Sequence, residues 1–248
     1  MPTTQEPERG KSKRFYRMRE NLVDVAAGLF AKNGYASTGV AEIGDATGLA
    51  RGALYYYMGS KEELLAVIHD RVMDPLLTEA EVIVGLEVSF PARLRLLSES
   101  LLRQIINRHD HVWVFLHEYR QLQGEDRDRF REKRNRFEEY VRGVLAEGQR
   151  EGHVRVKDLG LTTLAFLNLH NYTYQWVAGH EALGVVELSR FYCEIFLNGI
   201  ATAPVDQAAA EPELERGRAA LRDAVETATR AANARAARPL FVLNGLKI

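Results

Sequence analysis

Along most of the chain, apolar residues recur every three or four positions between polar ones, which is the spacing of one buried face of an α-helix. Near the N-terminus this repeat runs from Met18 through Leu22 to Phe30. It predicts one amphipathic helix over residues 14–33. Gly34 is placed to end that helix, because glycine readily adopts the left-handed backbone conformation that follows a helix.

Shorter helical segments follow the first helix. Thr38 can cap a short second helix that Gly48 ends, and residues 50–58 predict a third helix that Gly59 ends. A Ser-x-x-Glu capping box that starts at Ser60 predicts a longer fourth helix. Two short helices, joined by a glycine-containing turn and buttressed by a long helix, indicate a helix-turn-helix.

The remaining chain predicts a second unit of longer helices. The weakly patterned stretch from Pro75 to Pro91 marks the passage into it, although the fourth helix can run across that boundary. Further helices are expected over residues 92–108, 111–123, 125–151, 158–179 and 186–201. Beyond a linker, the Ala- and Arg-rich tail over 213–237 is compatible with a helix but lacks large apolar residues to dock it firmly. The final segment, PLFVLNGLKI, is apolar enough to pack against another surface.

Composition supports an all-α fold. Prolines are few (7 in 248 residues), long runs are rich in Ala, Leu, Glu and Arg, and alternating Val, Ile or Thr stretches are scarce. Cys193 is the single cysteine, which excludes an intrachain disulfide or a cysteine-based metal cage, and we expect no metal or cofactor. The sequence has no secretory signal or long uncharged apolar span, so we expect a cytoplasmic protein with no membrane partner.

Charge is unevenly distributed although the formal net charge is only -1. Between Arg9 and Arg19 there are six basic residues and no acidic one. A polyanion such as DNA is therefore a plausible partner for this end of the chain, and a solvated N-terminal tail is the equally weighted alternative.

The third predicted helix, ARGALYYYM at residues 50–58, carries three consecutive tyrosines. If Leu54 and Met58 face the body of the domain, a rotation of about 100° per residue turns Tyr56 outward. A helix that enters the major groove needs a short outer surface for base edges and hydrogen-bond donors at its rims for phosphates. The residues of this helix expected to contact DNA are Arg51, Gly52, Ala53, Tyr55, Tyr56 and Tyr57. Half-buried packing tyrosines are the alternative interpretation.

Individual roles follow from position on this helix. Tyr56, on the outer face, is expected to meet bases, whereas Tyr55 and Tyr57 flank it and can donate phenol O–H groups to phosphates on opposite rims. Lys61, in the first turn of the fourth helix, is suited to bind a phosphate beside unpaired backbone N–H groups. Thr38 either caps the second helix only or also contacts a phosphate.

Residues 34–65, GYASTGVAEIGDATGLARGALYYYMGSKEELL, resemble the TetR family of bacterial transcriptional regulators. The positions that match the family pattern are Gly34, Tyr35, Thr38, Val40, Glu42, Ile43, Gly48, Gly52, Leu54, Tyr55, Tyr57, Lys61 and Leu64. Three positions depart from it: Gly44 stands where alanine is usual, Ala50 where a serine normally caps the recognition helix, and Met58 where phenylalanine is common. Loss of the capping hydroxyl at Ala50 costs about 1 kcal/mol, so the third helix must depend more on packing.

The resemblance implies a homodimer whose two recognition helices enter successive major grooves of a palindromic operator in double-stranded DNA. It also implies a helical C-terminal domain that dimerises and binds a small hydrophobic inducer. The last two long helices would pair with their symmetry mates, and the residues expected at that seam are Leu188, Phe191, Ile195 and Phe196. The expected division is a flexible basic arm (1–13), a helix-turn-helix domain (14–75), a ligand-binding and dimerisation domain (76–202), and a linker with a C-terminal extension (203–248).

Two stretches, HDHVWVFLHEYRQL and FLNLHNYTYQW, combine apolar residues with polar groups as an inducer pocket requires. The candidate ligand-binding residues in them are Trp113, His117, Tyr119, Arg120, Asn168, Asn171, Tyr174 and Trp176. Each is also compatible with an ordinary buried helix. The patterns HEYR and NYTYQW are loosely similar to a TetR subgroup that controls fatty-acid and steroid breakdown and senses acyl-CoA thioesters.

The predicted function is a ligand-responsive repressor released from its operator by a hydrophobic small molecule, with an acyl-CoA thioester as a candidate. One alternative is an architectural DNA-binding protein that responds to no ligand. The other is an all-α enzyme that uses His117, Glu118 and Arg120. The enzyme is disfavoured because these polar groups lie within four consecutive positions of one helix, so they point around it, and no nucleophile pairs with a base.

Overall fold

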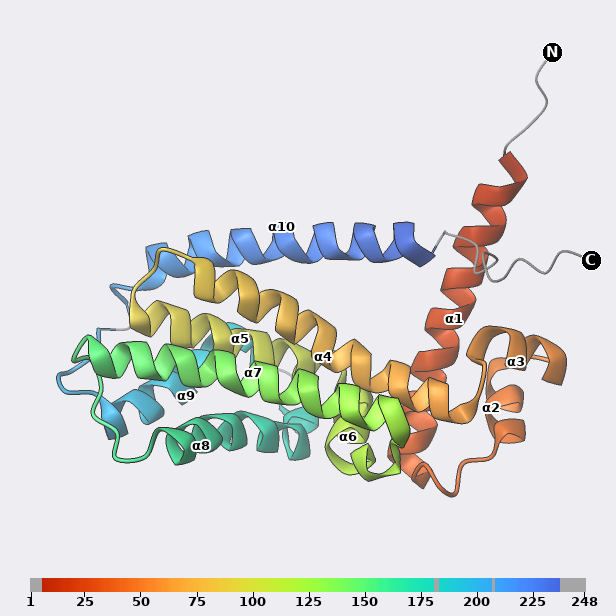
Figure 1. Cartoon of the computed structure of the whole chain (residues 1–248), viewed down its shortest axis with the longest axis horizontal. Coiled ribbons are helices and arrows are strands. Elements are labelled where there is room, and N and C mark those ends of the chain that lie inside the picture. Colours follow the sequence, from red (N-terminus) through yellow and green to blue (C-terminus); the bar gives the residue numbers. More distant parts are fainter. Residues whose placement is uncertain (1–5, 181–182, 207, 237–248) are drawn as a thin grey trace, which may run out of the picture.

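The structure, a computed structural model, describes residues 6–180, 183–206 and 208–236 (Figure 1). These residues form helices and contain no strand apart from an isolated bridge between Val154 and Ala201, which confirms the all-α fold class. The helices are α1 (Glu6–Asn33), α2 (Val40–Thr47), α3 (Arg51–Met58), α4 (Lys61–Gly85), α5 (Phe90–Asn107), α6 (His109–His117), α7 (Gly124–Arg150), α8 (Leu159–Asn171), α9 (Val185–Ile200) and α10 (Glu211–Ala236). None of the described helices is long and apolar enough to cross a membrane.

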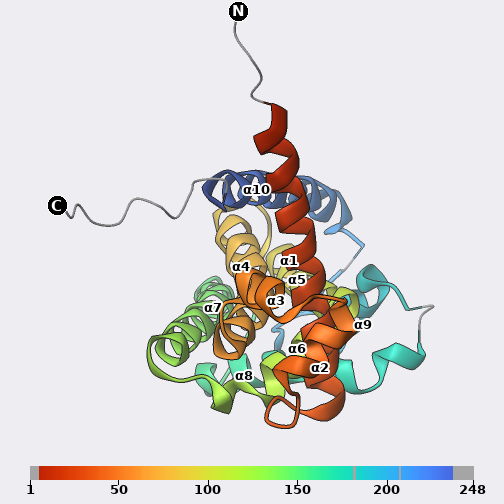
Figure 2. The same ribbon diagram turned by 90° about the vertical axis from the view of Figure 1, so that its right-hand side faces the viewer.

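A first core joins α1, α2, α3 and the start of α4. Its fully buried side chains include Phe30 of α1, Ile43 of α2, Leu54 of α3 and Ile68 of α4. Burial of one such side chain contributes about 1.5–3 kcal/mol, so these few contacts fix the angle between the short helices. The predicted helix-turn-helix is confirmed, and Figure 2 shows α2 and α3 at one end of the molecule, in front of the helical body.

The N-terminal boundary differs from the prediction. Helix α1 begins at Glu6, so residues 6–13, expected to belong to a flexible arm, continue the helix. Pro7 lies in the first turn, where a proline removes no intrahelical hydrogen bond, and the following residues other than Gly10 are compatible with a helix. The basic run is therefore the first part of α1. At its other end α1 stops before Gly34, whose φ of 82° confirms the predicted left-handed turn.

Thr38 does not cap α2, which corrects the prediction. The N-cap of α2 is Gly39, and no side chain caps this helix. The Thr38 hydroxyl instead donates to the carbonyl oxygen of Gly34 at 2.9 Å, and its side chain is buried. A short polar side chain can satisfy a nearby carbonyl group in this way, and here it closes the turn that follows α1.

Helix α4 runs through Pro75 and belongs to both units. Its first half packs in the helix-turn-helix core, and Leu76, Ala80 and Ile83 enter the second core. An interior proline costs about 3 kcal/mol because it removes one hydrogen bond and crowds the preceding turn. The apolar residues buried on both sides of Pro75 offset that cost, so the chain changes from one unit to the other within a helix.

The second core is formed mainly by α4, α5, α7, α8 and α9. Helix α8 ends at Asn171, although the prediction carried it to residue 179, and two short 3-10 turns (Tyr172–Gln175 and Val177–Gly179) follow it. Thr173 attaches the first of these turns to α9, because its buried hydroxyl pairs with the Tyr192 hydroxyl at 2.8 Å. Helix α6 likewise ends at His117, earlier than predicted, and a 3-10 turn (Tyr119–Gln121) completes the segment.

The C-terminal helix α10 docks firmly against α4 and α5, which corrects the expectation of a weakly attached tail (Figure 1). Leu214 and Leu221 are buried in the second core. Gly217 permits a close approach, because a Cβ atom there would lie 2.5 Å from the Leu96 Cδ1 atom. Helix α10 has few large apolar side chains, but its small residues let it pack very close to its neighbours, and this close contact docks it. The apolar segment PLFVLNGLKI lies outside the described residues.

A buried ion-pair cluster also attaches α10. Arg218 donates to both carboxylate oxygens of Glu99 on α5, from Nη2 at 2.6 Å and from Nε at 2.9 Å. The Glu99 side chain is buried beside the buried guanidinium of Arg95, which itself lies 3.3 Å from Glu211 of α10. The hydrogen bonds to Glu99 raise the pKa of Arg218 above its usual value. These charges alternate in sign, so each buried charge has an opposite neighbour.

We expect Arg218→Ala to lower the free energy of unfolding by about 3–5 kcal/mol, because it removes the bidentate partner of a buried carboxylate. Urea denaturation followed by circular dichroism measures this change. The matched control is Arg222→Ala, which truncates an exposed arginine one turn further along α10 and should change stability by no more than about 0.5 kcal/mol. Equal losses in the two variants would contradict the attachment of α10 through Glu99.

Candidate DNA-binding surface and ligand pocket

Helix α3 presents the face that its sequence predicts. Leu54 and Met58 are buried, whereas Tyr56 is 71% exposed and Tyr55 is 41% exposed. Tyr57 is half-buried. The predicted split of the tyrosines, with Tyr56 outermost, is what the structure shows.

Phe15 of α1 packs against the rings of Tyr56 and Tyr57, a contact that was not predicted from the sequence. Its ring centroid lies 5.4 Å from that of Tyr56 and 5.1 Å from that of Tyr57. The Phe15–Tyr56 pair is edge-to-face and the Phe15–Tyr57 pair is tilted. Edge-to-face aromatic pairs contribute about 0.5–1.5 kcal/mol beyond the area that they bury. The early turns of α1 therefore hold the exposed ring of α3 in one orientation.

The remaining predicted DNA contacts differ in exposure. Arg51 and Gly52 are exposed, Ala53 is half-buried, and the Arg51 guanidinium lies 5.9 Å from the Tyr55 ring centroid. Lys61 is half-buried, with its Nζ 4.2 Å from the centroid of the Tyr35 ring.

Thr38 does not belong to this exposed surface. Its hydroxyl is buried and occupied by the Gly34 carbonyl group, so it does not present a donor to a phosphate. The predicted phosphate contact of this side chain is not supported by its position.

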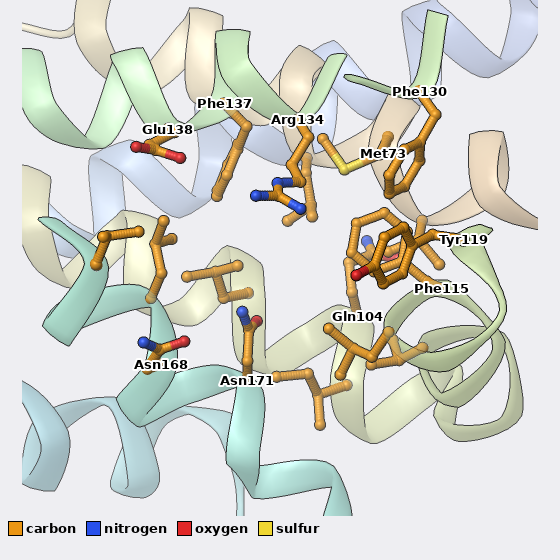
Figure 3. Close-up of a pocket in the computed structure, with 18 residues that line it drawn as sticks. Met73, Gln104, Phe115, Tyr119, Phe130, Arg134, Phe137, Glu138, Asn168 and Asn171 are labelled. Carbon is orange, nitrogen blue, oxygen red and sulfur yellow. The ribbon is translucent and has the colours of Figure 1, made fainter. Parts of the chain in front are cut away.

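A cavity of about 260 Å³ lies between α4, α5, α6, α7 and α8. Its apolar walls include Val72, Met73, Leu101, Phe115, Phe130 and Phe137. Figure 3 shows Arg134 and Glu138 reaching it from α7 on one side and Asn168 and Asn171 from α8 on the other. Mostly apolar walls with a few polar groups are typical of small-molecule sites.

Three of the predicted ligand-binding residues line this cavity: Tyr119, Asn168 and Asn171. Sequence reasoning missed Arg134 because its helix is rich in both charges and was interpreted as a solvated face. A signal was present, since Arg134 follows Phe130 by four positions and precedes Phe137 by three, which places it on the apolar stripe. The Arg120 guanidinium, whose Nε donates to the Tyr119 hydroxyl at 3.3 Å, lowers the pKa of Tyr119.

Gln104 was missed in the same way as Arg134. It lies on α5 three positions after Leu101, on the face that lines the cavity. A glutamine at a position where the repeat predicts an apolar side chain was the signal that could have identified it.

The other predicted ligand-binding residues do not line the cavity. Trp113 stacks on His117 with ring centroids 4.4 Å apart, and the His117 Nε2 atom lies 3.0 Å from the Tyr174 hydroxyl. Arg120 is exposed, and Trp176 is half-buried next to His180. Trp113, His117 and Tyr174 thus form an aromatic cluster beside the cavity.

Glu118, one of the residues considered for an enzyme, faces the DNA-binding unit. Its Oε1 atom accepts a hydrogen bond from the backbone N–H of Tyr35 at 3.0 Å. The His117 ring is hydrogen-bonded to the Tyr174 hydroxyl, and the Arg120 guanidinium is hydrogen-bonded to the Tyr119 hydroxyl. The three side chains therefore have separate partners. Catalysis by this group would require them to converge on one reacting atom, and they do not.

Exposed apolar side chains gather on α8 and α9, two helices that contact each other. On α9, Phe191 is 56% exposed and Ile195 is 50% exposed, and on α8 Leu161 and Leu164 are exposed. Of the four residues predicted for the dimer seam, Phe191 and Ile195 therefore face outward.

The other two predicted seam residues pack within the protomer. Leu188 is buried, and Phe196 is half-buried with its ring centroid 5.2 Å from that of Phe166. Leu188 is three positions from Phe191, but it points inward, where it joins Leu102 of α5 and Tyr192 in a small cluster. Its assignment to the seam is corrected.

Comparisons with known proteins agree with this architecture. The family model for bacterial regulatory proteins of the tetR family matches residues 22–68, and the model for the tetracyclin repressor-like C-terminal domain matches residues 87–200. The HTH-type transcriptional repressor KstR2 of Rhodococcus jostii (strain RHA1) is 30% identical over 197 residues, which cover 78% of this chain and 94% of that protein. Helix α10 lies beyond the residues matched by either family model.

Solved structures are similar over most of their length. The TetR family transcriptional regulator PfmR of Thermus thermophilus superimposes with a TM-score of 0.66 at 27% identity, covering 74% of this chain and 99% of that one. The regulator FadR of Bacillus subtilis, solved in complex with stearoyl-CoA, gives a TM-score of 0.59 at 24% identity and covers 75% of this chain and 99% of that one.

Substitutions on α3 should separate base contacts from phosphate contacts. We expect Tyr56→Ala to relax the preference among DNA sequences, because Tyr56 is the outermost ring of the helix. Tyr55→Phe should weaken binding to all sequences alike through loss of a phosphate contact. Binding to a randomised DNA library followed by sequencing measures both effects, and the reverse assignment of effects would show that α3 docks in a different rotation.

Ile195→Glu should prevent dimerisation and leave the fold of the protomer intact. Burial of an unpaired carboxylate in a dimer interface costs several kcal/mol, whereas in the separate protomer this position is half exposed. Sedimentation should then give a monomer with an unchanged helical circular dichroism spectrum and reduced DNA affinity. Glu194→Gln, at an exposed position next to it, is the control. A dimer with full affinity would place the interface elsewhere.

Proposed function

Because the chain belongs to the TetR family of bacterial regulatory proteins, we propose that it is a repressor released from a palindromic operator when an acyl-CoA thioester binds the cavity between α4 and α8. The observation that carries the ligand class is an apolar cavity with the guanidinium of Arg134 at its wall. The helix-turn-helix supplies the DNA-binding surface, with Arg51, Gly52, Ala53, Tyr55, Tyr56, Tyr57 and Lys61 as the contacting residues.

The size and charge of the cavity suggest how such a ligand is divided. Pockets that enclose drug-sized ligands measure about 300–1,000 Å³, and this cavity, at about 260 Å³, is smaller. The acyl portion therefore enters and the coenzyme A portion remains at the surface. Arg134 is exposed, and no carboxylate of the described residues forms an ion pair with it, so its charge is available to an anionic group.

Two adjacent residues connect the cavity to the DNA-binding unit. Tyr119 lines the cavity. Its neighbour Glu118 accepts a hydrogen bond from the backbone N–H group of Tyr35, in the turn that follows α1. Tyr35 is also joined to the start of α4, through its hydroxyl group 3.4 Å from Glu62 and through the Lys61 ammonium over its ring. Burial and the neighbouring carboxylate of Glu62 raise the pKa of Tyr35 to about 12, so the hydroxyl remains a hydrogen-bond donor. A ligand that displaces Tyr119 would act directly on this turn.

Release of DNA requires that the ligand bind the released arrangement more tightly than the DNA-bound one. In a dimer, a two-fold axis relates the two α3 helices, as a palindromic site requires. A change at the Tyr35 turn alters the position of each α3 helix relative to that axis. Small displacements of this kind are sufficient, because both helices must fit their grooves together.

Titration of the full-length protein against operator-containing DNA tests the proposal. Acyl-CoA thioesters of increasing chain length should lower the DNA affinity, whereas coenzyme A alone, the control, should not. DNA binding that responds to none of these ligands and shows little sequence preference would favour a ligand-independent architectural protein. Turnover of a thioester without DNA binding would favour an enzyme.

Glu118→Ala should weaken operator binding, because it leaves the N–H group of Tyr35 without its acceptor. An unsatisfied buried donor costs about 1–3 kcal/mol. That cost destabilises the arrangement of the Tyr35 turn that binds DNA, in which Glu118 accepts this hydrogen bond. Glu118→Gln keeps an oxygen acceptor and is the matched control, with affinity close to wild type. Fluorescence anisotropy with labelled operator measures both, and equal affinities of the Ala and Gln variants would contradict a coupling role for this contact.

A further inference from the structure

Gln104 is a buried polar residue in the wall of the cavity. It belongs to α5, and its side chain lines the space together with Leu101 and Ile105 of the same helix. The residue is only 7% exposed, and its Oε1 atom has no hydrogen-bond partner among the described residues. A buried amide oxygen without a partner is uncommon in folded proteins, because its desolvation is not compensated.

The packing around Gln104 does not require an amide. Its neighbours on the cavity wall are mainly aliphatic and aromatic, and leucine or methionine would fill a similar volume without an unsatisfied polar atom. The other polar side chains of the cavity stand on other helices, with Arg134 and Glu138 on α7 and Asn168 and Asn171 on α8 (Figure 3). The amide thus adds a separate polar position to an otherwise apolar wall.

We infer that Gln104 makes the cavity selective for a ligand whose apolar portion carries an oxygen function, a hydroxyl or keto group, over the plain hydrocarbon equivalent. This inference rests on the proposed function in taking the cavity as the inducer site. A glutamine side chain can accept a hydrogen bond from a hydroxyl group through Oε1 and, with the amide turned, donate one to a keto oxygen. A plain hydrocarbon chain would leave the amide oxygen unpaired, as it is in the unliganded protein.

The expected selectivity follows from that unpaired group. A site with a buried polar group discriminates strongly against the ligand that cannot pair with it, whereas an apolar site discriminates weakly against an added hydroxyl group. We therefore expect at least one oxygenated ligand to bind at least about tenfold more tightly than its hydrocarbon equivalent. In Gln104→Leu the same pair should bind with similar affinity, mainly because the oxygenated ligand loses its hydrogen-bond partner.

Calorimetric titration of the full-length protein with matched ligands tests the inference. The probes are decanoyl-CoA with its 3-hydroxy, 3-oxo and 10-hydroxy derivatives, so that the position and the kind of oxygen are both varied. Decanoic acid and 10-hydroxydecanoic acid form a second pair that lacks coenzyme A. Gln121→Leu, which makes the same change at an exposed position outside the cavity, is the control and should keep the wild-type preference.

Thermal unfolding of the unliganded variants guards against misfolding. Gln104→Leu removes an unpaired polar atom, so its midpoint should be no lower than that of the wild type. If it unfolds, Gln104→Met, which retains an unbranched side chain, takes its place in the titrations.

The outcomes separate the inference from the proposed function. Equal affinities for oxygenated and plain ligands in the wild type, or a preference unchanged in Gln104→Leu, would overturn the role of Gln104 while acyl-CoA control of DNA binding could still hold. If no thioester binds but the free hydroxy acid is preferred in a Gln104-dependent way, the inference holds and the thioester assignment fails. Binding of none of the probes would overturn both.

Discussion

The continuity of α4 is the constraint on which the rest of the structure depends. One helix carries Ile68 in the core of the DNA-binding unit and Leu76 in the second core, and it lines the cavity with Val72 and Met73 between them. The two units therefore share a rigid element and have no linker at the predicted boundary. A change at the cavity wall formed by α4 is at the same time a change in the support of α2 and α3.

Burial and charge together explain why α10, a helix with few large apolar residues, stays attached to the second unit. Glu99 is buried, so it needs a cation that is also withdrawn from water, and Arg218 supplies one with two hydrogen bonds. Once that pair is fixed, Gly217 lets the helix approach Leu96 closely enough for the small residues to pack. The helix consequently packs along α4 and α5, and α4 is the element that the two units share.

The sequence was most informative where a local physical rule acted alone. The three tyrosines of α3, the turn at Gly34 and the helical class all follow from periodicity and glycine geometry, and the structure agrees with each. Prediction was wrong where a contact other than the expected one decided the outcome. Thr38 bonds to the carbonyl group of Gly34, four positions back, and not to the start of α2. Leu188 packs under α5, and Arg218 pairs with a carboxylate 119 positions away. The cavity was predicted in part, because Asn171 and Tyr119 lie in stretches that combine apolar and polar residues. Arg134 and Gln104 were missed, because the fact that each is a polar residue on the apolar stripe of its helix was overlooked.

The two connections between cavity and DNA-binding unit differ in how easily they can change. Helix α4 is held by cores at both ends, so breaking it would cost the burial of several side chains, and it can only move as a body. The contact between Glu118 and the Tyr35 N–H is a single hydrogen bond, which contributes about 0.5–1.5 kcal/mol when made. Control by a small ligand requires a difference in binding free energy of only about 1–3 kcal/mol between two arrangements, which is the scale of the second connection. We therefore expect the hydrogen bond to decide which arrangement is populated, while α4 determines how far the helices that contact DNA can move.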